Sequence, residues 1–315
     1  MDSNYTQIQL LIQERADCQA RMNLLSCTGT PEIKDRNGKP FLYIRKREAG
    51  KQTSTYVGAY NDTTYRLLLR DAQEARVLRK RIRQLNKALA ELGYSDSELS
   101  TAVQENLAFA RTNIKTAIYD QAVLEGVATT FPQTETILEN GIVNGVSPSD
   151  VQKIINLKHA WEFILDSDVL AYPTDYSILC HIASLINEGL LPHGTEGRIR
   201  GVPVSIGGTS YIPPLPFESV IKENLSDILT CDQSAEDKAI RLCLYCMKTQ
   251  VFLDGNKRAA VIFANHYLIS QGGGLLIIPE ASVSEFKKLL ILYYEDRDSG
   301  EIMRFFKDNC ILRLN

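Results

Sequence analysis

A short polar loop, Asp254-Gly255-Asn256-Lys257-Arg258, holds the residues whose types and spacing could do chemistry. Gly255 permits a tight turn, and Asn256 can cap the helix expected to begin there. The free N–H groups of such a helix start, with Lys257 and Arg258 on the same turn, predict a site for phosphate oxygens. Asp254 is placed to hold a Mg²⁺ ion that bridges those oxygens. An ordinary capped helix start with solvated charges is the alternative interpretation of the same five residues.

The longer string around this loop is more specific. With Phe252 and the five loop residues, it resembles the signature of the Fic family, a histidine followed by x-Phe-x-Asp/Glu-Gly-Asn-Gly/Lys-Arg. The segment Gly197 to Pro216, which contains Arg200, resembles the family's approach to its flap hairpin. Asn265 and the tail Phe305 to Ile311 are also similar to relatives. The resemblance therefore covers about residues 100–312.

This resemblance implies a mainly α protein with the all-helical Fic fold, which carries a short β-hairpin flap. The family's usual reaction moves the AMP part of ATP onto a hydroxyl of a target protein and releases pyrophosphate. By resemblance, Asp254 would bind Mg²⁺, and Phe252 would pin the loop into the core. The implied phosphate-binding residues are Gly255, Asn256, Lys257 and Arg258. The implied flap residues, which would align the target by strand addition, are Thr209, Ser210, Tyr211 and Ile212.

Position 250, where the family has its catalytic histidine, is Gln250. An imidazole can take a hydroxyl proton at neutral pH, whereas a carboxamide can only hydrogen-bond. Loss of general-base help costs roughly 10²–10⁴-fold in rate. We therefore expect a nucleotide-binding Fic domain with slow or absent AMP transfer. The alternatives are a silent regulator that binds a nucleotide or partner, and a nucleic-acid-binding protein with an attached Fic domain. The histidines, none of which stands at this position, are His159, His181, His193 and His266.

Two further departures from the family pattern concern regulation and chemistry. Many relatives carry a second arginine where this chain has Val261, and Lys257 without it resembles the branch that includes Doc, which phosphorylates its target. A kinase-like transfer therefore stays open. The family's self-inhibitory helix reads Ser/Thr-x-x-x-Glu-Gly/Asn, and the nearest match starts at Gln121. Glu125 could fold over the nucleotide site there, without its usual arginine partner, or simply end a helix before a glycine.

The elements that would position this loop follow from periodicity. Apolar helical patterns run from Lys238 to Thr249 and from Ala259 to Ile269, on the two sides of the loop. Prolines favour a short hairpin or flap over residues 203–216. The N-terminal part predicts a helix over 4–24, a β-hairpin of 41–47 with 52–57 around Ala49-Gly50-Lys51, and a long helix over 63–92. The expected apolar side of that helix is Leu67, Leu68, Ala72, Ala75, Leu78, Ile82, Leu85 and Leu89.

Residues 93–97 form the candidate boundary between a basic N-terminal module, 1–95, and a Fic domain, 96–315. Between Lys39 and Glu91 there are 13 basic and 5 acidic residues, against a net charge of −3 for the whole chain. Basic residues among aromatics suit nucleic acid; the alternative is a solvated helix face beside a small core. The aromatics are Phe41, Tyr43, Tyr56 and Tyr60, and the first expected contacts are Arg76, Arg79, Lys80 and Arg83.

Bulk composition indicates a globular protein, with 44% hydrophobic and 23% charged residues in 315. No apolar run approaches the roughly 20 residues of a membrane helix, and the first residues lack a signal-like pattern. Seven scattered cysteines include Cys243 and Cys246, which we expect to be buried thiols of one helix. We expect a reduced, cytoplasmic protein whose partner is a target protein with a modifiable hydroxyl; a homodimer stays open.

Overall fold

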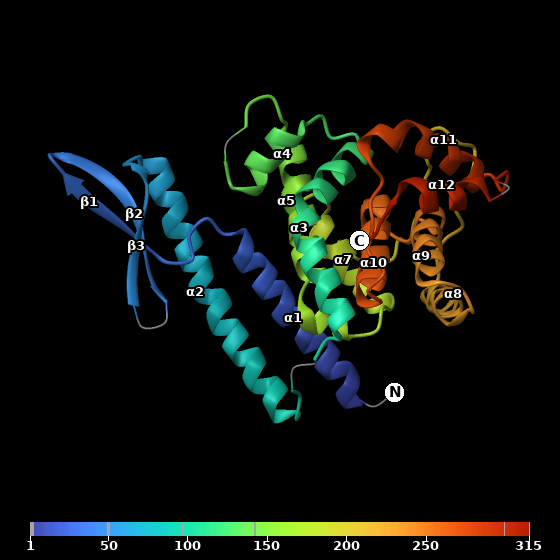
Figure 1. Cartoon of the computed structure of the whole chain (residues 1–315), viewed down its shortest axis with the longest axis horizontal. Helices are drawn as coiled ribbons and strands as arrows, with labels where there is room; N and C mark the ends of the chain where they lie inside the picture. Colours follow the sequence, from blue (N-terminus) through green and yellow to red (C-terminus); the bar gives the residue numbers. More distant parts are fainter. Residues whose placement is uncertain (1–2, 49–50, 96–97, 142, 299, 315) are drawn as a thin grey trace. The chain divides into compact units, whose positions relative to one another are not determined.

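The computed structural model describes residues 3–48, 51–95, 98–141, 143–298 and 300–314. The chain forms two compact units, Met1–Ser95 (unit 1) and Asp96–Asn315 (unit 2) (Figure 1). The expected mainly α class is confirmed, because strands in the described residues are confined to a small sheet in unit 1 and a short pair in unit 2. No helix in the described ranges is both long and apolar enough to cross a membrane.

Unit 1 contains two helices, α1 (Ser3–Leu24) and α2 (Asp62–Glu91), and both agree with the predicted ranges to within one residue. Two of its strands, β2 (Lys39–Glu48) and β3 (Lys51–Ala59), pair antiparallel as the predicted hairpin. The turn residues 49 and 50, and residues 96 and 97 of the expected boundary, lie outside the described part. Asn61 caps α2, since its side chain accepts a hydrogen bond from the Thr64 amide at 3.0 Å.

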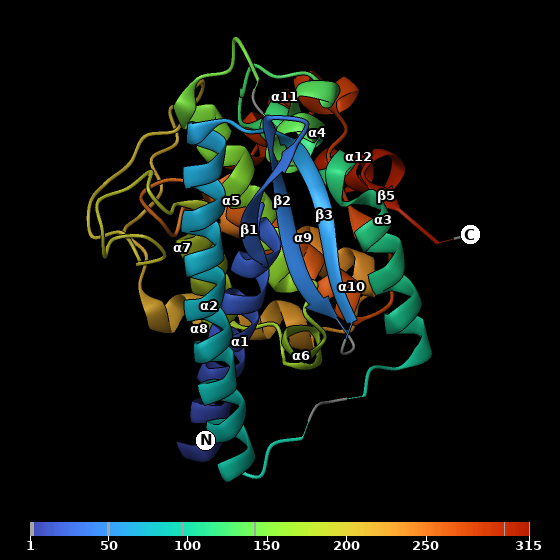
Figure 2. The same ribbon diagram turned by 90° about the vertical axis from the view of Figure 1, so that its left-hand side faces the viewer.

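A third strand was missed in the sequence. Strand β1 (Thr30–Arg36) pairs antiparallel with β2, so the order is β1-β2-β3 (Figure 2). The turn between them is Asn37-Gly38, with φ of 56° and 75°. An Asn-Gly pair between strands is the strongest short-range signal of a hairpin, because both residues tolerate positive φ. That signal was present and could have predicted β1.

One face of the sheet packs on α2 through a cluster of Cys27, Leu42, Leu68 and Ala72. A second cluster of Cys18, Leu78 and Leu85 joins α1 to α2. The prediction for Leu67 is wrong, because its side chain is 38% exposed. Asp71 is buried on that side instead, and its Oδ2 accepts a hydrogen bond from the Ser26 amide at 3.0 Å. A buried carboxylate is tolerated there because a backbone N–H satisfies it.

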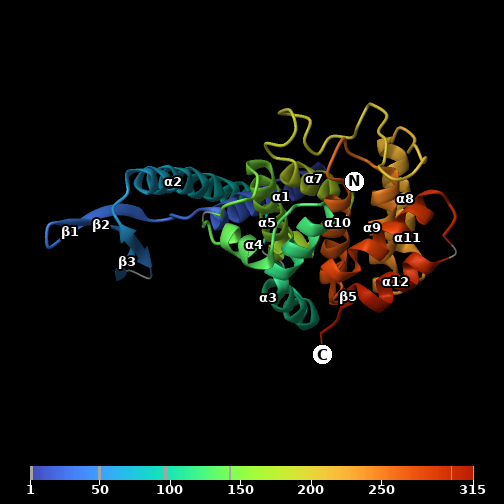
Figure 3. The ribbon, with the colours of Figure 1, turned by 90° about the horizontal axis from the view of Figure 1, so that it is seen from above.

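Unit 2 is helical around a central buried helix, α10 (Asn256–Ser270). Nearly every residue of α10 is buried, as expected for a helix with neighbours on all sides. Helix α9 (Ala235–Thr249) lies beside it (Figure 3). Both predicted apolar helices are thus confirmed. The other elements are α3 (Thr101–Leu124), α4 (Phe131–Leu138), α5 (Pro148–Ile164), α6 (Ser167–Ala171), α7 (Tyr176–Ile186), α8 (Glu218–Thr230), β4 (Leu275–Leu276), η1 (Glu280–Ser282), α11 (Val283–Tyr294), α12 (Glu301–Asn309) and β5 (Ile311–Leu312).

The predicted hairpin over residues 203–216 is wrong. The structure describes all of residues 201–217, and they form no strand. An isolated antiparallel bridge joins Ile199 to Phe252 just before this segment. Pro213, Pro214 and Pro216 have no N–H to donate, which removes ladder hydrogen bonds on one side of a hairpin. The segment is therefore an irregular flap that other contacts must hold.

Cys243 and Cys246 are both buried in α9, as expected, and burial raises the pKa of both thiols. All seven cysteines are free. High thiol pKa values leave little reactive thiolate at neutral pH. The two residues therefore act as small apolar core residues of unit 2.

Candidate functional site

The loop between α9 and α10 is a tight turn fixed by two left-handed residues. Gln250 ends α9 with φ 49° and ψ 62°, and Gly255 precedes α10 with φ 77°. A Cβ atom at Gly255 would lie 2.8 Å from Asn187 Oδ1 and 3.0 Å from Ile186 Cδ1. Only glycine fits both this backbone and this space. Asn187 also donates a hydrogen bond to the Asp254 carbonyl at 3.1 Å, which fixes the loop against the end of α7.

The prediction that Asn256 caps α10 is wrong. Gly255 is the capping position, and no side chain makes the cap hydrogen bond. The Asn256 side chain instead accepts from the Phe252 amide at 2.8 Å and donates to the Phe252 carbonyl at 2.7 Å. It also donates to Gln250 Oε1 at 3.1 Å. Asn256 thus closes the loop, with Phe252 buried beneath it, and leaves the first N–H groups of α10 unused.

Unsatisfied donors gather at this helix start. The amides of Asn256, Lys257 and Arg258 have no protein acceptor among the described residues. The Arg258 side chain is buried, and its Nη1 donates to the Ile186 carbonyl at 3.1 Å. Its Nε has no hydrogen-bond partner within the same ranges. A buried unsatisfied donor costs about 1–3 kcal/mol, so these groups fit an anionic ligand such as phosphate.

Glu125, directly after α3, lies against the two cations of this turn. Its Oε1 is 3.4 Å from Lys257 Nζ and its Oε2 is 3.5 Å from Arg258 Nε. Its side chain is only 13% exposed. The sequence left Glu125 without an arginine partner because position 261 is valine; the structure supplies Arg258 instead. The carboxylate therefore contacts both cations of the predicted phosphate site.

Gln121, four positions before Glu125 on α3, joins α3 to α10 and α5. Its Nε2 donates to the Arg258 carbonyl at 2.8 Å, and its Oε1 accepts from Trp161 Nε1 at 3.0 Å. All three groups are buried, so the network joins α3, α5 and α10 in a low-dielectric core. Val261 lies beside Gln121 in a small cavity. Glutamine at the first position of the inhibitory pattern is thus a structural tie between α3 and α10.

Asp254 is an exposed carboxylate at the edge of the site, with 61% of its side chain accessible. Its Oδ1 accepts from the Gly255 amide at 2.7 Å, and its Oδ2 lies 3.3 Å from Arg258 Nη2. The described residues contain no group of three or more His, Cys, Asp or Glu side chains suited to a metal. One carboxylate beside a phosphate site still fits Mg²⁺, which commonly takes its other ligands from phosphate and water.

Gln250 has both ends of its carboxamide engaged. Its Nε2 donates to the Met247 carbonyl at 2.6 Å, while its Oε1 accepts from Asn256. His266 is ten positions along α10 and makes hydrogen bonds to Thr174 Oγ1 at 2.8 Å and the Val169 carbonyl at 3.0 Å. Burial lowers the pKa of His266, which keeps it neutral and structural. The two hydrogen bonds of Gln250 therefore fix the start of the loop to α9 and to Asn256.

Two flap residues face inward. Thr209 Oγ1 donates a hydrogen bond at 2.8 Å to Oε1 of Glu295, which is the residue just after α11. The Tyr211 ring stacks on Tyr294, with 6.1 Å between ring centroids and 15° between planes. The alternate residues Ser210 and Ile212 are exposed. This alternation is typical of an extended segment with one covered and one free side.

Arg200 supports the flap from beneath. Its buried guanidinium donates to the carbonyls of Gln250 at 2.5 Å, Val202 at 2.9 Å and Pro214 at 2.6 Å. Burial lowers the pKa of Arg200. Among the described residues the hydrogen-bond acceptors of Arg200 are backbone carbonyls, and no carboxylate forms an ion pair with it. Arg200 was noted in the sequence as part of the flap resemblance, but its role in joining the flap to the loop was not predicted.

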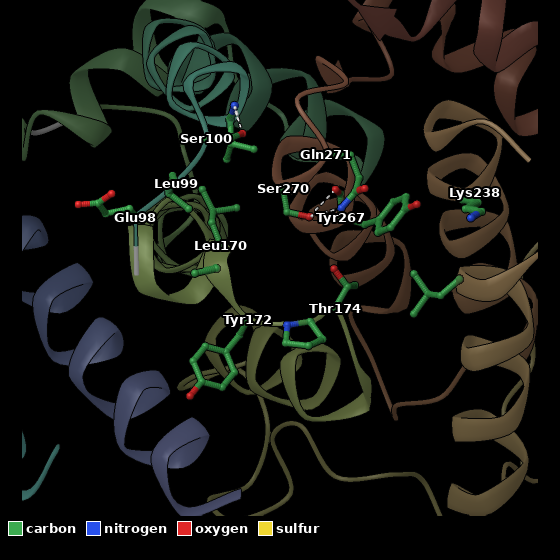
Figure 4. A pocket seen from close by; sticks show the side chains of 14 residues that line it. Glu98, Leu99, Ser100, Leu170, Tyr172, Thr174, Lys238, Tyr267, Ser270 and Gln271 are labelled. Carbon is green, nitrogen blue, oxygen red and sulfur yellow. Dashed lines mark hydrogen bonds between the residues drawn. The ribbon is translucent and has the colours of Figure 1, made fainter. Parts of the chain in front are cut away.

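A cavity of about 630 Å³ in unit 2 lies elsewhere. Figure 4 shows its lining by Leu99, Tyr172, Thr174, Ser270 and Gln271, among others. Ser270 is the last residue of α10, whereas the loop described above is at the first. The cavity is therefore at the opposite end of the helix, and it is not part of the predicted phosphate site.

Comparisons with known proteins concern two segments of the chain and its fold. Residues 173–268 match the model of the Fic/DOC family, and residues 5–66 match a domain of unknown function (DUF6788). No curated protein matches the chain.

Several solved structures that are similar to this chain are described as Fic proteins. A Fic domain containing signaling protein from Bacteroides thetaiotaomicron is 16% identical over 67% of this chain and 86% of its own, with a TM-score of 0.53. A Fic family protein from Desulfovibrio desulfuricans is 14% identical over 68% and 73%, with a TM-score of 0.52. Fic-1 from C. elegans is 20% identical over 75% and 77%, with a TM-score of 0.49. Residues 173–268 of unit 2 thus match the Fic/DOC family model, and the fold of the chain is similar to that of solved Fic structures.

Proposed function

We propose that unit 2 binds ATP with Mg²⁺ at the start of α10, and that its AMP transfer to a protein hydroxyl is slow or lost. The observation that carries nucleotide binding is the set of donors without a hydrogen bond on one helical turn: three backbone amides and the buried Nε of Arg258, which lies 3.5 Å from the Glu125 carboxylate. A helix start of this kind binds phosphate groups through its N–H groups and its dipole. Lys257 and Arg258 add positive charge at the same point.

In this proposal each residue of the site has a separate role in ligand binding. Arg258 and the loop amides hold the phosphates, and Asp254 holds Mg²⁺, which neutralises phosphate charge when bound. The exposed side of the flap, at Ser210 and Ile212, aligns the target segment beside the site. We place the protein in the cytoplasm, because its seven cysteines are free thiols.

Gln250 favours a second function, in which the nucleotide site regulates rather than catalyses. Its carboxamide donates to the Met247 carbonyl of α9 and accepts from Asn256 of the loop, so both of its polar atoms hold the loop in place. A carboxamide also cannot accept a proton at neutral pH. In this version ATP binding itself is the signal, passed to a partner protein through the flap or α3.

Glu125→Ala is expected to tighten binding of Mg·ATP by about tenfold. Removing the carboxylate frees Lys257 and Arg258 for phosphate, and a competing charge-assisted contact is worth roughly 1.5 kcal/mol. Isothermal titration calorimetry on the full chain measures the affinity. Glu285→Ala, which removes the same charge from an exposed position of α11, is the matched control and should leave the affinity unchanged.

Arg258→Gln serves as the loss control in the same titration, because it removes the buried guanidinium. Weaker binding in Glu125→Ala would show that this carboxylate is a ligand rather than an obstruction. If neither the native chain nor Glu125→Ala binds ATP, nucleotide binding by this domain is refuted.

A further inference from the structure

The outer face of the unit 1 sheet, opposite α2, combines aromatic and basic side chains. Leu42 and Ile44 of β2 pack toward α2, so alternate residues of the strands project to the other side. The cationic groups of Lys34 and Arg36 lie over the Tyr43 ring, 4.7 Å and 5.5 Å from its centroid. Both residues are therefore on the same face of the sheet as Tyr43. The aromatic and basic residues of this outer face include Lys34, Arg36, Phe41, Tyr43, Arg45, Arg47 and Tyr56.

Tyr56 is the exposed ring of this face. Its residue is 56% exposed, which is unusual for a tyrosine in a sheet. Its ring is 5.5 Å from that of Tyr43 and 6.0 Å from that of Phe41, which support it on one side. A ring held in place from below and open above is a platform on which a planar base can stack.

Much of the positive charge near the Tyr56 ring is not balanced by acidic side chains among the described residues. Glu32 is the described acid of this face, and its carboxylate is 3.0 Å from Arg45 Nε and 3.7 Å from Lys34 Nζ. Arg36 and Arg47 have no acidic partner among the described side chains. The face therefore keeps a positive potential close to the exposed ring.

A basic cavity of about 420 Å³ lies where β2 extends past the start of β1 toward α2. Its cationic lining is Arg45, Lys46, Arg47, Arg76 and Arg79. Gly29 forms part of its wall, and a Cβ there would overlap the Arg45 carbonyl, so the chain lies tightly on β2. Arg79 donates to the Thr28 carbonyl, which fixes one guanidinium in the wall. Lys46 and Arg76 have no ionic partner in the described ranges.

We propose that unit 1 binds single-stranded nucleic acid, with a base stacked on Tyr56 and backbone phosphates in the basic cavity. Arg45 and Arg47 belong both to the outer face that carries Tyr56 and to the lining of the cavity, so a single strand can reach the cavity from the ring along the end of β2. Aromatic rings combined with a cationic groove are the usual arrangement for single strands, in which bases are free to stack. A duplex keeps its bases paired and would not use the ring. An acidic protein would use the charges alone. Of the contacts expected from sequence, Arg76 and Arg79 line the cavity, whereas Lys80 and Arg83 do not.

The test is fluorescence anisotropy of labelled oligothymidylate and oligouridylate with the full chain, in excess unlabelled Mg·ATP to occupy the Fic site. Tyr56→Ala should weaken binding at least about fivefold, because stacking is lost, and Tyr56→Phe should keep it. Lys46→Gln with Arg76→Gln should lower the slope of log affinity against log salt by about 1.4, as two phosphate contacts disappear.

Two matched controls remove the same groups elsewhere. Lys287→Gln with Lys288→Gln takes two charges from exposed positions of α11, and Val57→Ala truncates the residue next to Tyr56. Neither should change the affinity. The proposal is overturned if no oligonucleotide binds, or if the controls weaken binding equally. It is also overturned if duplex DNA or polyglutamate competes as well as single strands and Tyr56→Ala binds like the native chain. Preference for one oligonucleotide identifies DNA or RNA as the ligand.

Discussion

The full chain carrying both Gln250→His and Glu125→Ala is expected to transfer AMP to protein at least about 100-fold faster than the native chain. Histidine at position 250 restores a general base, which is worth roughly 10²–10⁴-fold. Removal of the Glu125 carboxylate leaves Lys257 and Arg258 to phosphate. Position 250 has φ 49°, a conformation in which histidine is more frequent than most residues, so the loop should accept it.

The measurement is incorporation of α-phosphate-labelled ATP, with Mg²⁺, into proteins of a cell extract. Gln250→His alone should give an intermediate rate, because Glu125 still competes for the cations. Arg258→Ala in the double variant should abolish labelling. Melting temperatures of all variants show whether unit 2 remains folded. γ-Phosphate label in a parallel reaction would reveal phosphoryl transfer instead of AMP transfer.

Two outcomes would change the proposal. Label with the native chain that disappears in Arg258→Ala would show a histidine-independent transferase, and the doubt over Gln250 would be wrong. A double variant that binds ATP without transferring it would show that more than the base has been lost. In that case the regulatory function is the better account of unit 2.

Arg200→Met is expected to lower the melting temperature of unit 2 by about 6–12 °C. The methionine fills part of the space but leaves the carbonyls of Gln250 and Pro214 without their donor. Loss of these charge-assisted hydrogen bonds should cost about 3 kcal/mol, and each kcal/mol shifts the transition of a domain of this size by about 2–4 °C. Differential scanning calorimetry measures the shift.

Arg198→Met is the control, because Arg198 is exposed two positions earlier and carries the same charge. The melting temperature of Arg198→Met should equal that of the native chain. The melting temperature of Arg200→Lys should lie between those of Arg200→Met and the native chain, since one ammonium group cannot reach all the carbonyls that the guanidinium spans. An unchanged melting temperature in Arg200→Met would show that water replaces the arginine and that the flap is held by Thr209 and Tyr211 alone.

Local features were predictable where the chain itself supplies the cause. The helices on both sides of the loop follow from apolar periodicity, and the turn follows from a glycine that must adopt positive φ. Strand β1 could have been found in the same way, because its Asn37-Gly38 turn is a local signal. The flap hairpin failed for a local reason too: the prolines that mark the segment also remove its donors.

The sequence by itself determined the tight loop of residues 254–258, the absence of an imidazole at position 250 and the basic charge of the N-terminal module. Each depends on residue type and spacing within a few turns of chain. Only the tertiary structure decided that Gln121 ties α3 to the Arg258 carbonyl, 137 positions away, and that Glu125 contacts Lys257 and Arg258. It also placed β2 beside Arg76 and Arg79. Such contacts arise from the packing of distant elements, and no local periodicity or motif encodes which side chains will meet.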